Sequence, residues 1–566
     1  MSLQFITGNS GNGKTKYLFN RIVKEAKANP RDNYLVIVPE QFTMQTQRQL
    51  VDLSENKAIM NIDVLSFKRL AYRVFDELGI TNLTVLEETG KNLVLRKLAA
   101  QEADKLGVIG RNLNRIGYIS EVKSLLSELV QYNISPEELG RYIASGRLSD
   151  TLSDKLKDVL VLYEAFEKFM QDKYITAEEI LNVLSNVAEE SAILRNSVIA
   201  FDEFTGFTPI QNQLIKKLFV ISKKIYVTLT IDCREDIFKS RGMQELFDMP
   251  KRTVKSLTEM AAFYGIEVEE PIILDKNYRL AENEELSFME QQLFRKRRCS
   301  FKKAPKHIHI DCLRDPKQEL TKIARRINEL VRNENLRYRD IAIVTGDVNI
   351  YAGYVREIFD KYNIPYFIDA TQEILFHPFI EFIRSIPDIA AQNFSADAVF
   401  RFLRCGFSEL LDSEIDVLEN YVLACGVRGK SAWDKKWVRL PKHKAGYDLE
   451  LLNQSREYIM ELLKPVYQVF SDKKSTVKDY VLAIYKLIVL LDIPDKLAKK
   501  EQALLDAGDQ TASKEYGQIY KIVMQLFEKY VAVLGDECMD AEEFTQILDA
   551  GLDAADVAVI RRDTTL

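Results

Sequence analysis

The sequence has few of the residues that build metal centres or disulfide frameworks. Its 566 residues include only six cysteines and four histidines. No two cysteines have CxxC spacing, and the histidines form no HxxxH or HExxH pattern, so we expect scattered reduced thiols and structural histidines instead of a zinc site. These residues are Cys233, Cys299, Cys312, Cys405, Cys425 and Cys538, with His307, His309, His377 and His443.

Long apolar runs and an excess of positive charge are also missing. The longest apolar run, Tyr480 to Leu491, is interrupted by Lys486 and is too short to span a bilayer. The first residues, MSLQFITGNSGNGK, lack the pattern of a signal peptide. Lys and Arg number 78 against 84 Asp and Glu, a net charge of −6, which excludes a globally basic nucleic-acid coat but not a local basic groove. We expect a cytoplasmic protein without membrane contact.

What is present indicates a multidomain globular chain. Hydrophobic residues make up 46% and charged residues 29%, and the length favours three or four domains. Near the N-terminus, apolar segments alternate with helical periodicity, which is typical of a parallel α/β sheet. The predicted strands are Leu3–Thr7, Tyr34–Val38, Ile62–Ser66, Ser197–Phe201 and Lys224–Ile231, and the predicted helices between them include Lys14–Ala28 and Phe67–Leu78.

A helical block interrupts this first α/β pattern. Between residues 86 and 190 the apolar residues recur at i, i+3 and i+4, as in Ser120–Leu129 and Asp158–Met170. The sequence therefore predicts a discontinuous first domain, residues 1–85 and 191–300, with a helical insertion at residues 86–190.

A second α/β segment follows the basic, proline-containing stretch RKRRCSFKKAPK, a candidate linker. Its predicted strands are His307–Cys312, Ile341–Thr345 and Pro365–Asp369, separated by helices at Pro316–Arg332 and Tyr351–Tyr362. Three parallel strands make a thin sheet, so we expect residues 305–375 to be part of a domain whose remaining strands lie beyond Leu566. Residues 376–566 read as a second helical insertion.

The strongest local signal is a glycine-rich match to GxxxxGK[ST] between a predicted strand and helix, as a Walker A P-loop requires. Its glycines let backbone N–H groups surround a β-phosphate, Lys14 would neutralise β/γ oxygens, and Thr15 would be a Mg²⁺ ligand. The alternative is an ordinary glycine-rich turn. The predicted nucleotide-binding residues are Gly8, Asn9, Ser10, Gly11, Asn12, Gly13, Lys14 and Thr15.

The second signal is a hydrophobic strand that ends in two acids, Asp202 and Glu203, in VIAFDEF. As a Walker B motif it would use Asp202 to hold Mg²⁺ and Glu203 as the general base that polarises the attacking water. Acidic residues also end many ordinary strands. In Asn277-Tyr278-Arg279, Arg279 could contact a γ-phosphate, although an ordinary surface arginine is the simpler interpretation. No carboxylate cluster with a neighbouring lysine suggests a two-metal nuclease.

Taken in order along the chain, these motifs resemble the AddB family, which supplies one of the two subunits of AddAB-type ATP-dependent helicase/nucleases. The resemblance extends from Leu3 to about Ala550. Besides the glycine-rich motif, it rests on VIVPEQFTMQTQ, VLSFKRLAYRVF, FDEFTGFTPIQ, YRDIAIVTGDVNIYAGYVREIFDKYNIPYFIDA, HPFIEFIRS and LENYVLACGVRG.

The resemblance implies an architecture and a role. Family members resemble UvrD-type superfamily 1 helicases, with two RecA-like P-loop domains (1A, 2A) that each carry a helical insertion (1B, 2B), the second sheet being incomplete here. The implied cofactors are ATP and Mg²⁺. The implied partners are single-stranded DNA, duplex ends and the helicase/nuclease motor protein with which AddB forms a heterodimer. The family's nuclease and 4Fe–4S cluster belong to its C-terminal half, so none of the six cysteines is expected to bind the cluster.

Several departures from an active motor are visible in the sequence. Only seven residues precede Gly8, too few for the motor's upstream glutamine motif. The third motif of the motor should follow the strand Ile225–Ile231, but the chain reads Asp232-Cys233-Arg234 there. We therefore expect a chain that binds ATP·Mg²⁺ and DNA for the processing of double-strand breaks in recombinational repair, with slow or absent hydrolysis. The alternatives are an independent superfamily 1 helicase or DNA-dependent ATPase, and a non-catalytic P-loop scaffold.

Overall fold

The computed structural model describes most of the chain as helices and strands arranged in two compact units. The described residues are 1–80, 85–86, 88–108, 110, 118–146, 148–171, 174–295, 299–368, 372–374, 376–440, 447–472, 474–553 and 556–557. His443 and three of the predicted linker residues, 296–298, lie outside them. The first unit comprises residues 1–85, 125–142 and 170–311, and the second comprises residues 86–124, 143–169 and 312–566.

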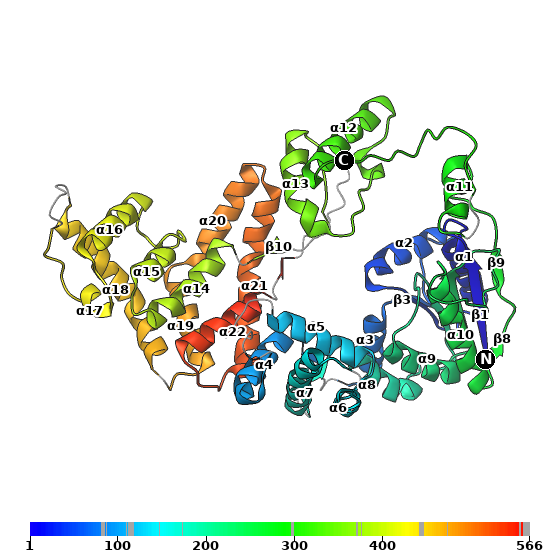
Figure 1. Cartoon of the computed structure of the whole chain (residues 1–566), viewed down its shortest axis with the longest axis horizontal. Helices are drawn as coiled ribbons and strands as arrows, with labels where there is room; N and C mark the ends of the chain where they lie inside the picture. The colour runs from blue at the N-terminus through cyan, green and yellow to red at the C-terminus, as the bar shows by residue number, and fades with distance from the viewer. Residues whose placement is uncertain are drawn as a thin grey trace. The chain divides into compact units, whose positions relative to one another are not determined.

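A seven-stranded sheet forms the centre of the first unit (Figure 1). Its hydrogen-bonded order is β3-β2-β6-β7-β1-β8, and β9 also pairs with β1. Neighbouring strands run parallel, so their carboxyl ends meet at one edge of the sheet. The strands are β1 (Ser2–Gly8), β2 (Tyr34–Ile37), β3 (Ile62–Leu65), β6 (Val198–Phe201), β7 (Lys224–Thr230), β8 (Glu267–Val268) and β9 (Ile272–Leu274).

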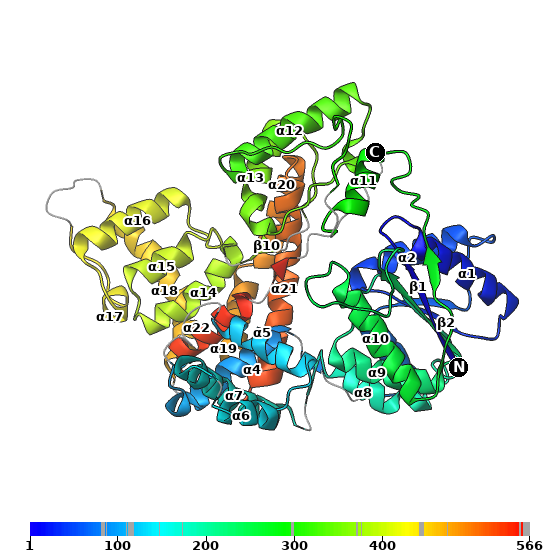
Figure 2. The same ribbon diagram turned by 45° about the vertical axis from the view of Figure 1, so that its right-hand side comes forward.

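Helices cover both faces of this sheet because successive strand residues point in opposite directions. Val36 packs with residues of α1 (Lys14–Ala28) and α2 (Thr43–Leu53), whereas its neighbour Leu35 packs with the helices of the other face. Those helices are α3 (Phe67–Leu78), α8 (Ile180–Val187), α9 (Pro209–Ile221) and α10 (Asp248–Phe263). Figure 2 shows this arrangement of helices around the strands. The first predicted sheet is thus confirmed.

The block between β3 and β6 is helical, as predicted. Its helices are α4 (Glu88–Gln101), α5 (Tyr118–Gln131), α6 (Pro136–Ala144) and α7 (Asp150–Met170), with a 3-10 turn at Ala103–Lys105. The short strands β4 (Val85–Leu86) and β5 (Ile175–Thr176) form a separate two-stranded sheet. They pair near the start and the end of this helical stretch. The helical insertion at residues 86–190 remains a prediction.

The second α/β segment differs from the prediction. Its helices are present as α12 (Pro316–Asn333) and α13 (Val348–Lys361), which pack through Leu320, Ala324 and Phe359. The described residues of the three predicted strands, 307–312, 341–345 and 365–368, are not strands; Asp369 lies outside the described residues. A strand exists only when a neighbour supplies backbone hydrogen bonds, and the side chains of Ile310 and Val344 are 94% and 93% exposed. A second RecA-like sheet remains a prediction.

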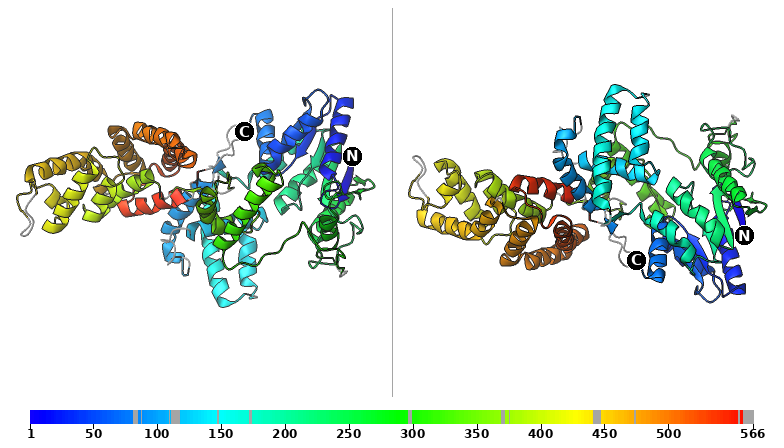
Figure 3. Two further views of the ribbon diagram at one scale, coloured as in Figure 1. Left: turned by 90° about the horizontal axis from the view of Figure 1, so that it is seen from above. Right: turned by 90° about the horizontal axis from the view of Figure 1, so that it is seen from below.

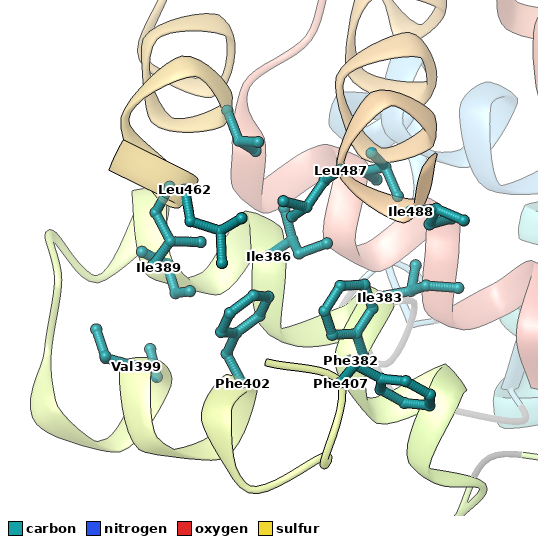
Figure 4. Close-up of a cluster of buried hydrophobic side chains, with 14 of the residues drawn as sticks. Phe382, Ile383, Ile386, Ile389, Val399, Phe402, Phe407, Leu462, Leu487 and Ile488 are labelled. Atoms are coloured by element: carbon teal, nitrogen blue, oxygen red, sulfur yellow. The ribbon is translucent and has the colours of Figure 1, made fainter. Parts of the chain in front are cut away.

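From residue 376 onward the described chain is almost entirely helical (Figure 3). One apolar core holds these helices together, and part of it is shown in Figure 4 around Phe382, Ile386 and Leu487. In the described chain, no helix is apolar over the length that a bilayer requires. The elements are α14 (Pro378–Ala391), α15 (Ala396–Leu403), α16 (Asp412–Cys425), α17 (Lys430–Trp433), α18 (Leu449–Ser471), α19 (Val477–Leu490), α20 (Ile493–Asp506), α21 (Gln510–Leu534) and α22 (Ala541–Asp553).

Two short strands that pair with each other also flank this helical block. The two-residue strands β10 (Gln372–Glu373) and β11 (Asp556–Val557) pair in antiparallel fashion on either side of it. The second helical insertion, residues 376–566, also remains a prediction.

Candidate nucleotide-binding site

The residues Gly8 to Thr15, here called the glycine loop, connect β1 to α1 at the carboxyl edge of the sheet. Gly13 directly precedes α1 and has a left-handed φ of 77°. Gly11 has a φ of 89°, and a Cβ placed there would lie 2.8 Å from Asn277 Oδ1 and 2.9 Å from Arg279 Cβ. Glycine is therefore required at Gly11 both by the backbone conformation and by close packing.

The ammonium group of Lys14 is folded into this loop. Its Nζ donates hydrogen bonds to the carbonyl oxygens of Gly8 at 3.1 Å and Asn9 at 3.0 Å. Burial lowers the pKa of Lys14, while the nearby carboxylates of Glu203 and Asp202 act in the opposite direction. The loop thus holds the ammonium through its own backbone carbonyls, with two carboxylates nearby.

The two acids after β6 face the same loop. Asp202 is 1% exposed, and within the described chain its Oδ2 accepts no hydrogen bond, whereas Oδ1 accepts one from Thr228. Burial raises the pKa of Asp202, with the hydroxyls of Thr228 and Thr15 acting in the opposite direction. Glu203 is exposed, has a left-handed φ of 64°, and accepts a hydrogen bond from Thr15 Oγ1 at 3.3 Å.

A segment that follows β9 packs on the outer side of the glycine loop. Asn277 Nδ2 donates to the carbonyl oxygen of Ser10 at 2.9 Å, and the Tyr278 N–H donates to that of Gly11 at 3.0 Å. Arg279 is exposed, as a surface arginine would be, yet it lies against the loop and its charge helps to lower the pKa of Lys14.

Sequence reasoning assigned no role to Asn277 or Tyr278, although both precede Arg279 in the same triplet. Their contacts depend on the pairing of β9 with β1, which ends at Leu274 beside Gly8. That pairing is not visible in local sequence patterns. The one available signal was that both residues are adjacent to Arg279, which the sequence had already marked as a candidate.

The position of the motor's third motif is occupied by a structural ion pair. Asp232, which is 1% exposed, accepts hydrogen bonds from Arg234 Nε at 2.9 Å and Arg295 Nε at 2.9 Å. Burial alone would raise the pKa of Asp232, but the hydrogen bonds from Arg234 and Arg295 outweigh it and hold the pKa well below its usual value. This carboxylate is fully engaged within the protein.

The donor set of the glycine loop suits an anion accompanied by a divalent cation. Left-handed glycines, the amino end of α1 and the Lys14 ammonium favour negative charge. The uncompensated Asp202 Oδ2 is an oxygen ligand of the type that Mg²⁺ prefers. In the described residues no group of three or more His, Cys, Asp and Glu side chains could hold a metal alone, so a cation here would share its ligands with the anion.

Comparison with known proteins places the chain in a family. Residues 5–290 match the family described as "ADDB, N-terminal". The chain belongs to the AddB family. It is 38% identical to the B-type subunit of the ATP-dependent helicase/deoxyribonuclease of Lachnoclostridium phytofermentans, over 99% of this chain and 49% of that protein. The proteins of the same name from Clostridium acetobutylicum and Caldanaerobacter subterraneus are each 32% identical, over 98% and 99% of this chain.

The AddB relatives are about twice as long as the matched region. The alignments cover 48% of the protein from Clostridium acetobutylicum and 49% of that from Caldanaerobacter subterraneus. The chain therefore spans about half the length of the curated relatives it matches, and the activities in their names belong to the whole proteins.

Proposed function

We propose that this chain is the ATP-binding and DNA-binding portion of the AddB subunit in a bacterial helicase/deoxyribonuclease that processes double-strand breaks for recombinational repair. The observation that carries the proposal is the meeting of the glycine loop with Asp202 and Glu203 at one sheet edge. Membership of the AddB family and the names of its relatives support the DNA-processing context.

The proposal assigns ATP·Mg²⁺ to residues of the glycine loop and the end of β6. The backbone N–H groups of residues 8–13 and the Lys14 ammonium would bind the phosphates, and Thr15 and Asp202 would be the Mg²⁺ ligands. Bound Mg²⁺ neutralises part of the phosphate charge. Lys14 would exchange the carbonyl oxygens of Gly8 and Asn9 for phosphate oxygens.

Tyr278 would stack the nucleotide base. The residue is 65% exposed, and an atom of its ring lies 3.5 Å from the point where a Gly13 Cβ would stand. Lys276 Nζ lies 5.0 Å from the centre of that ring. An exposed aromatic face beside the loop can stack a base, and Arg279 beside it would contribute positive charge toward the phosphates.

Slow or uncoupled hydrolysis remains part of the proposal. Glu203 would act as the general base, and the exposure of its carboxylate and its hydrogen bond with Thr15 support this role. Asp232, however, is occupied by Arg234 and Arg295 instead of being free to link a phosphate to DNA. A second candidate, an independent DNA-dependent ATPase, is favoured by Glu203 alone.

DNA contact is proposed at the same edge of the sheet. The neighbouring strands β3 and β2 lead into the amino ends of α3 and α2, and helix amino ends favour phosphates. Ser66 caps α3, and Lys68 and Arg69 are exposed in its first turn. The motor protein as a partner, and the nuclease and 4Fe–4S cluster in the other half of AddB, are carried over from the resemblance.

Nucleotide binding tests the central claim. The full chain is titrated with a fluorescent ATP analogue and Mg²⁺, and Lys14→Ala is compared with Lys16→Ala, an exposed lysine of the same helix. We expect Lys14→Ala to lose binding and Lys16→Ala to retain it. Equal binding by both variants, or none by the native chain, would overturn the proposal.

DNA binding is tested separately with labelled single-stranded DNA. Affinity should fall steeply between about 50 and 200 mM salt, because phosphate contacts release counterions. Lys68→Ala should weaken binding and Lys216→Ala, an exposed lysine of α9, should not. Salt-independent binding would contradict a backbone-phosphate interface.

A further inference from the structure

A closed ring of polar contacts fastens the glycine loop to the segment that leads out of the first unit. Asn9 Oδ1 accepts a hydrogen bond from the Cys233 N–H at 2.9 Å, and Asn9 Nδ2 donates to Glu290 Oε1 at 2.9 Å. Arg295 Nη2 lies 3.9 Å from Glu290 Oε1, and Arg295 Nε donates to Asp232 Oδ2 at 2.9 Å. Because Asp232 directly precedes Cys233, the ring is closed. We call these five residues the Asn9 ring.

In the ring, Asn9 and Asp232 are buried and the other three members are partly buried, so displacing one member disturbs the contacts of the others. Asn9 is 4% exposed, Asp232 is 1% exposed, and the Arg295 side chain is 11% exposed. Removing one partner from such a site leaves another polar group buried and unpaired, which is costly. A displacement of Asn9 must therefore be followed by its partners.

Asn9, a member of the ring, contacts the Lys14 ammonium, which would respond to a bound anion. The backbone carbonyl of Asn9 accepts a hydrogen bond from Lys14 Nζ at 3.0 Å. A phosphate in the glycine loop would draw the ammonium away from this carbonyl. When Lys14 exchanges the Asn9 carbonyl for a phosphate, Asn9 is therefore the ring member that is affected first.

Arg295, another member of the ring, adjoins a constrained stretch of backbone. Phe294, next to Arg295, has a left-handed φ of 58° and a side chain that is 78% exposed. A bulky residue keeps such a conformation only when its surroundings impose it. The chain is anchored again where the N–H groups of Lys306 and His307 donate to Glu285.

We propose that Asp232 and Arg295 are positioning residues that link occupancy of the glycine loop to the conformation of residues 294–295 and 299–306, within the segment that leaves the first unit. The proposal rests on the proposed nucleotide binding. Asp232 lies where the resemblance predicts that the third motif of the motor has been lost. In the proposal, the Asn9 ring links nucleotide binding in the glycine loop to the segment that leaves the first unit, instead of to an element that contacts DNA.

Hydrogen–deuterium exchange of the full chain tests this linkage. In the native chain, saturating ATP·Mg²⁺ should slow exchange in peptides covering residues 8–15 and change it in peptides covering residues 294–306. In Arg295→Gln the first effect should remain and the second should be lost. Arg295→Lys, which can keep the ion pair with Asp232, should restore part of it.

The matched control is Lys303→Gln, which removes the exposed ion pair between Lys303 and Glu284 and should leave both effects intact. Two outcomes separate the claims. If nucleotide gives no protection of residues 8–15 in the native chain, the nucleotide site is wrong and the linkage fails with it. If that protection is present but residues 294–306 do not respond, or respond equally in Arg295→Gln, only the linkage is overturned.

Discussion

The hydroxyl of Thr15 donates a hydrogen bond of 3.3 Å to the carboxylate of Glu203, which lies 188 positions later in the chain. The two residues follow β1 and β6, and β7 runs between these strands. Since all three strands are parallel, their carboxyl ends share one edge, and the loops after β1 and β6 meet across the end of β7. The long helical stretch between β3 and β6 does not prevent this contact, because the chain leaves and returns through β4 and β5, which pair with each other outside the main sheet.

Asp202 and Glu203 should differ in their effects on nucleotide binding. In Asp202→Asn, the gain in nucleotide affinity that Mg²⁺ provides should disappear, because the variant replaces a buried carboxylate oxygen that accepts no hydrogen bond within the described chain. In Glu203→Gln, Mg²⁺-dependent binding should remain, while any ATP hydrolysis falls about a hundredfold or more. Titrations with and without Mg²⁺, together with phosphate release, measure both. Identical behaviour of the two variants would argue against their separate roles.

Gly11→Ala should weaken nucleotide binding by about tenfold or more, because a Cβ would collide with Asn277 and Arg279 in a backbone conformation that alanine disfavours. The control is Gly79→Ala, where φ is also left-handed, at 67°, but no atom lies within 4 Å of the added Cβ. Nucleotide affinity and melting temperature are measured for both. Unchanged affinity in Gly11→Ala would show that the close packing on the loop is not required.

Asn453→Leu should destabilise the helical block by about 2–4 kcal/mol. Asn453 accepts a hydrogen bond from the Trp437 N–H at 2.8 Å and donates to the Trp437 carbonyl at 2.9 Å, and its Oδ1 also accepts from Arg456 Nε at 3.1 Å. All these buried groups would lose a partner.

Urea unfolding followed by tryptophan fluorescence measures this change. The chain has only two tryptophans, Trp433 and Trp437, and both lie in this core. The fluorescence therefore reports on the block itself. Asn420→Leu is the control, since Asn420 is exposed and should change stability little. Equal unfolding midpoints for the two variants would contradict the prediction.

Acidification should destabilise the same block through His377. Burial lowers the pKa of His377 to about 4, and its Nδ1 accepts a hydrogen bond from the Phe379 N–H at the start of α14. The unfolded imidazole has a pKa of about 6.5, so between these values the unfolded state binds more protons than the folded one. The contribution of the neutral imidazole is complete above pH 6.5 and is lost as the pH falls toward 4, at a cost of up to about 3 kcal/mol.

His377→Asn provides the comparison, because asparagine caps a helix without titrating. Unfolding midpoints from tryptophan fluorescence should fall more steeply between pH 6.5 and 4 in the native chain than in the variant. Parallel pH profiles would show that His377 is not the responsible group.

Much of the fold and of the candidate site followed from local patterns. The helix Lys14–Ala28 and the helix Phe67–Leu78 were predicted with the bounds that the structure has, because apolar spacing and glycine positions mark them directly. The two-acid ending of β6 likewise pointed to Asp202 and Glu203. The predictions that failed are the strands at residues 307–312, 341–345 and 365–368, where apolar residues suggested strands that the described chain does not contain.

The sequence by itself determined five of the seven strands of the sheet in the first unit, all but β8 and β9, and it placed a glycine loop and two acids at strand ends. The tertiary structure alone decided the strand order, the contact of Thr15 with Glu203, the packing of Asn277 and Tyr278 on the loop, and the ring that joins Asn9 to Arg295. The physical reason is the distance along the chain over which each interaction acts. Side-chain periodicity and glycine conformation act within a few residues, whereas strand pairing and buried ion pairs depend on which distant segments come together to exclude water.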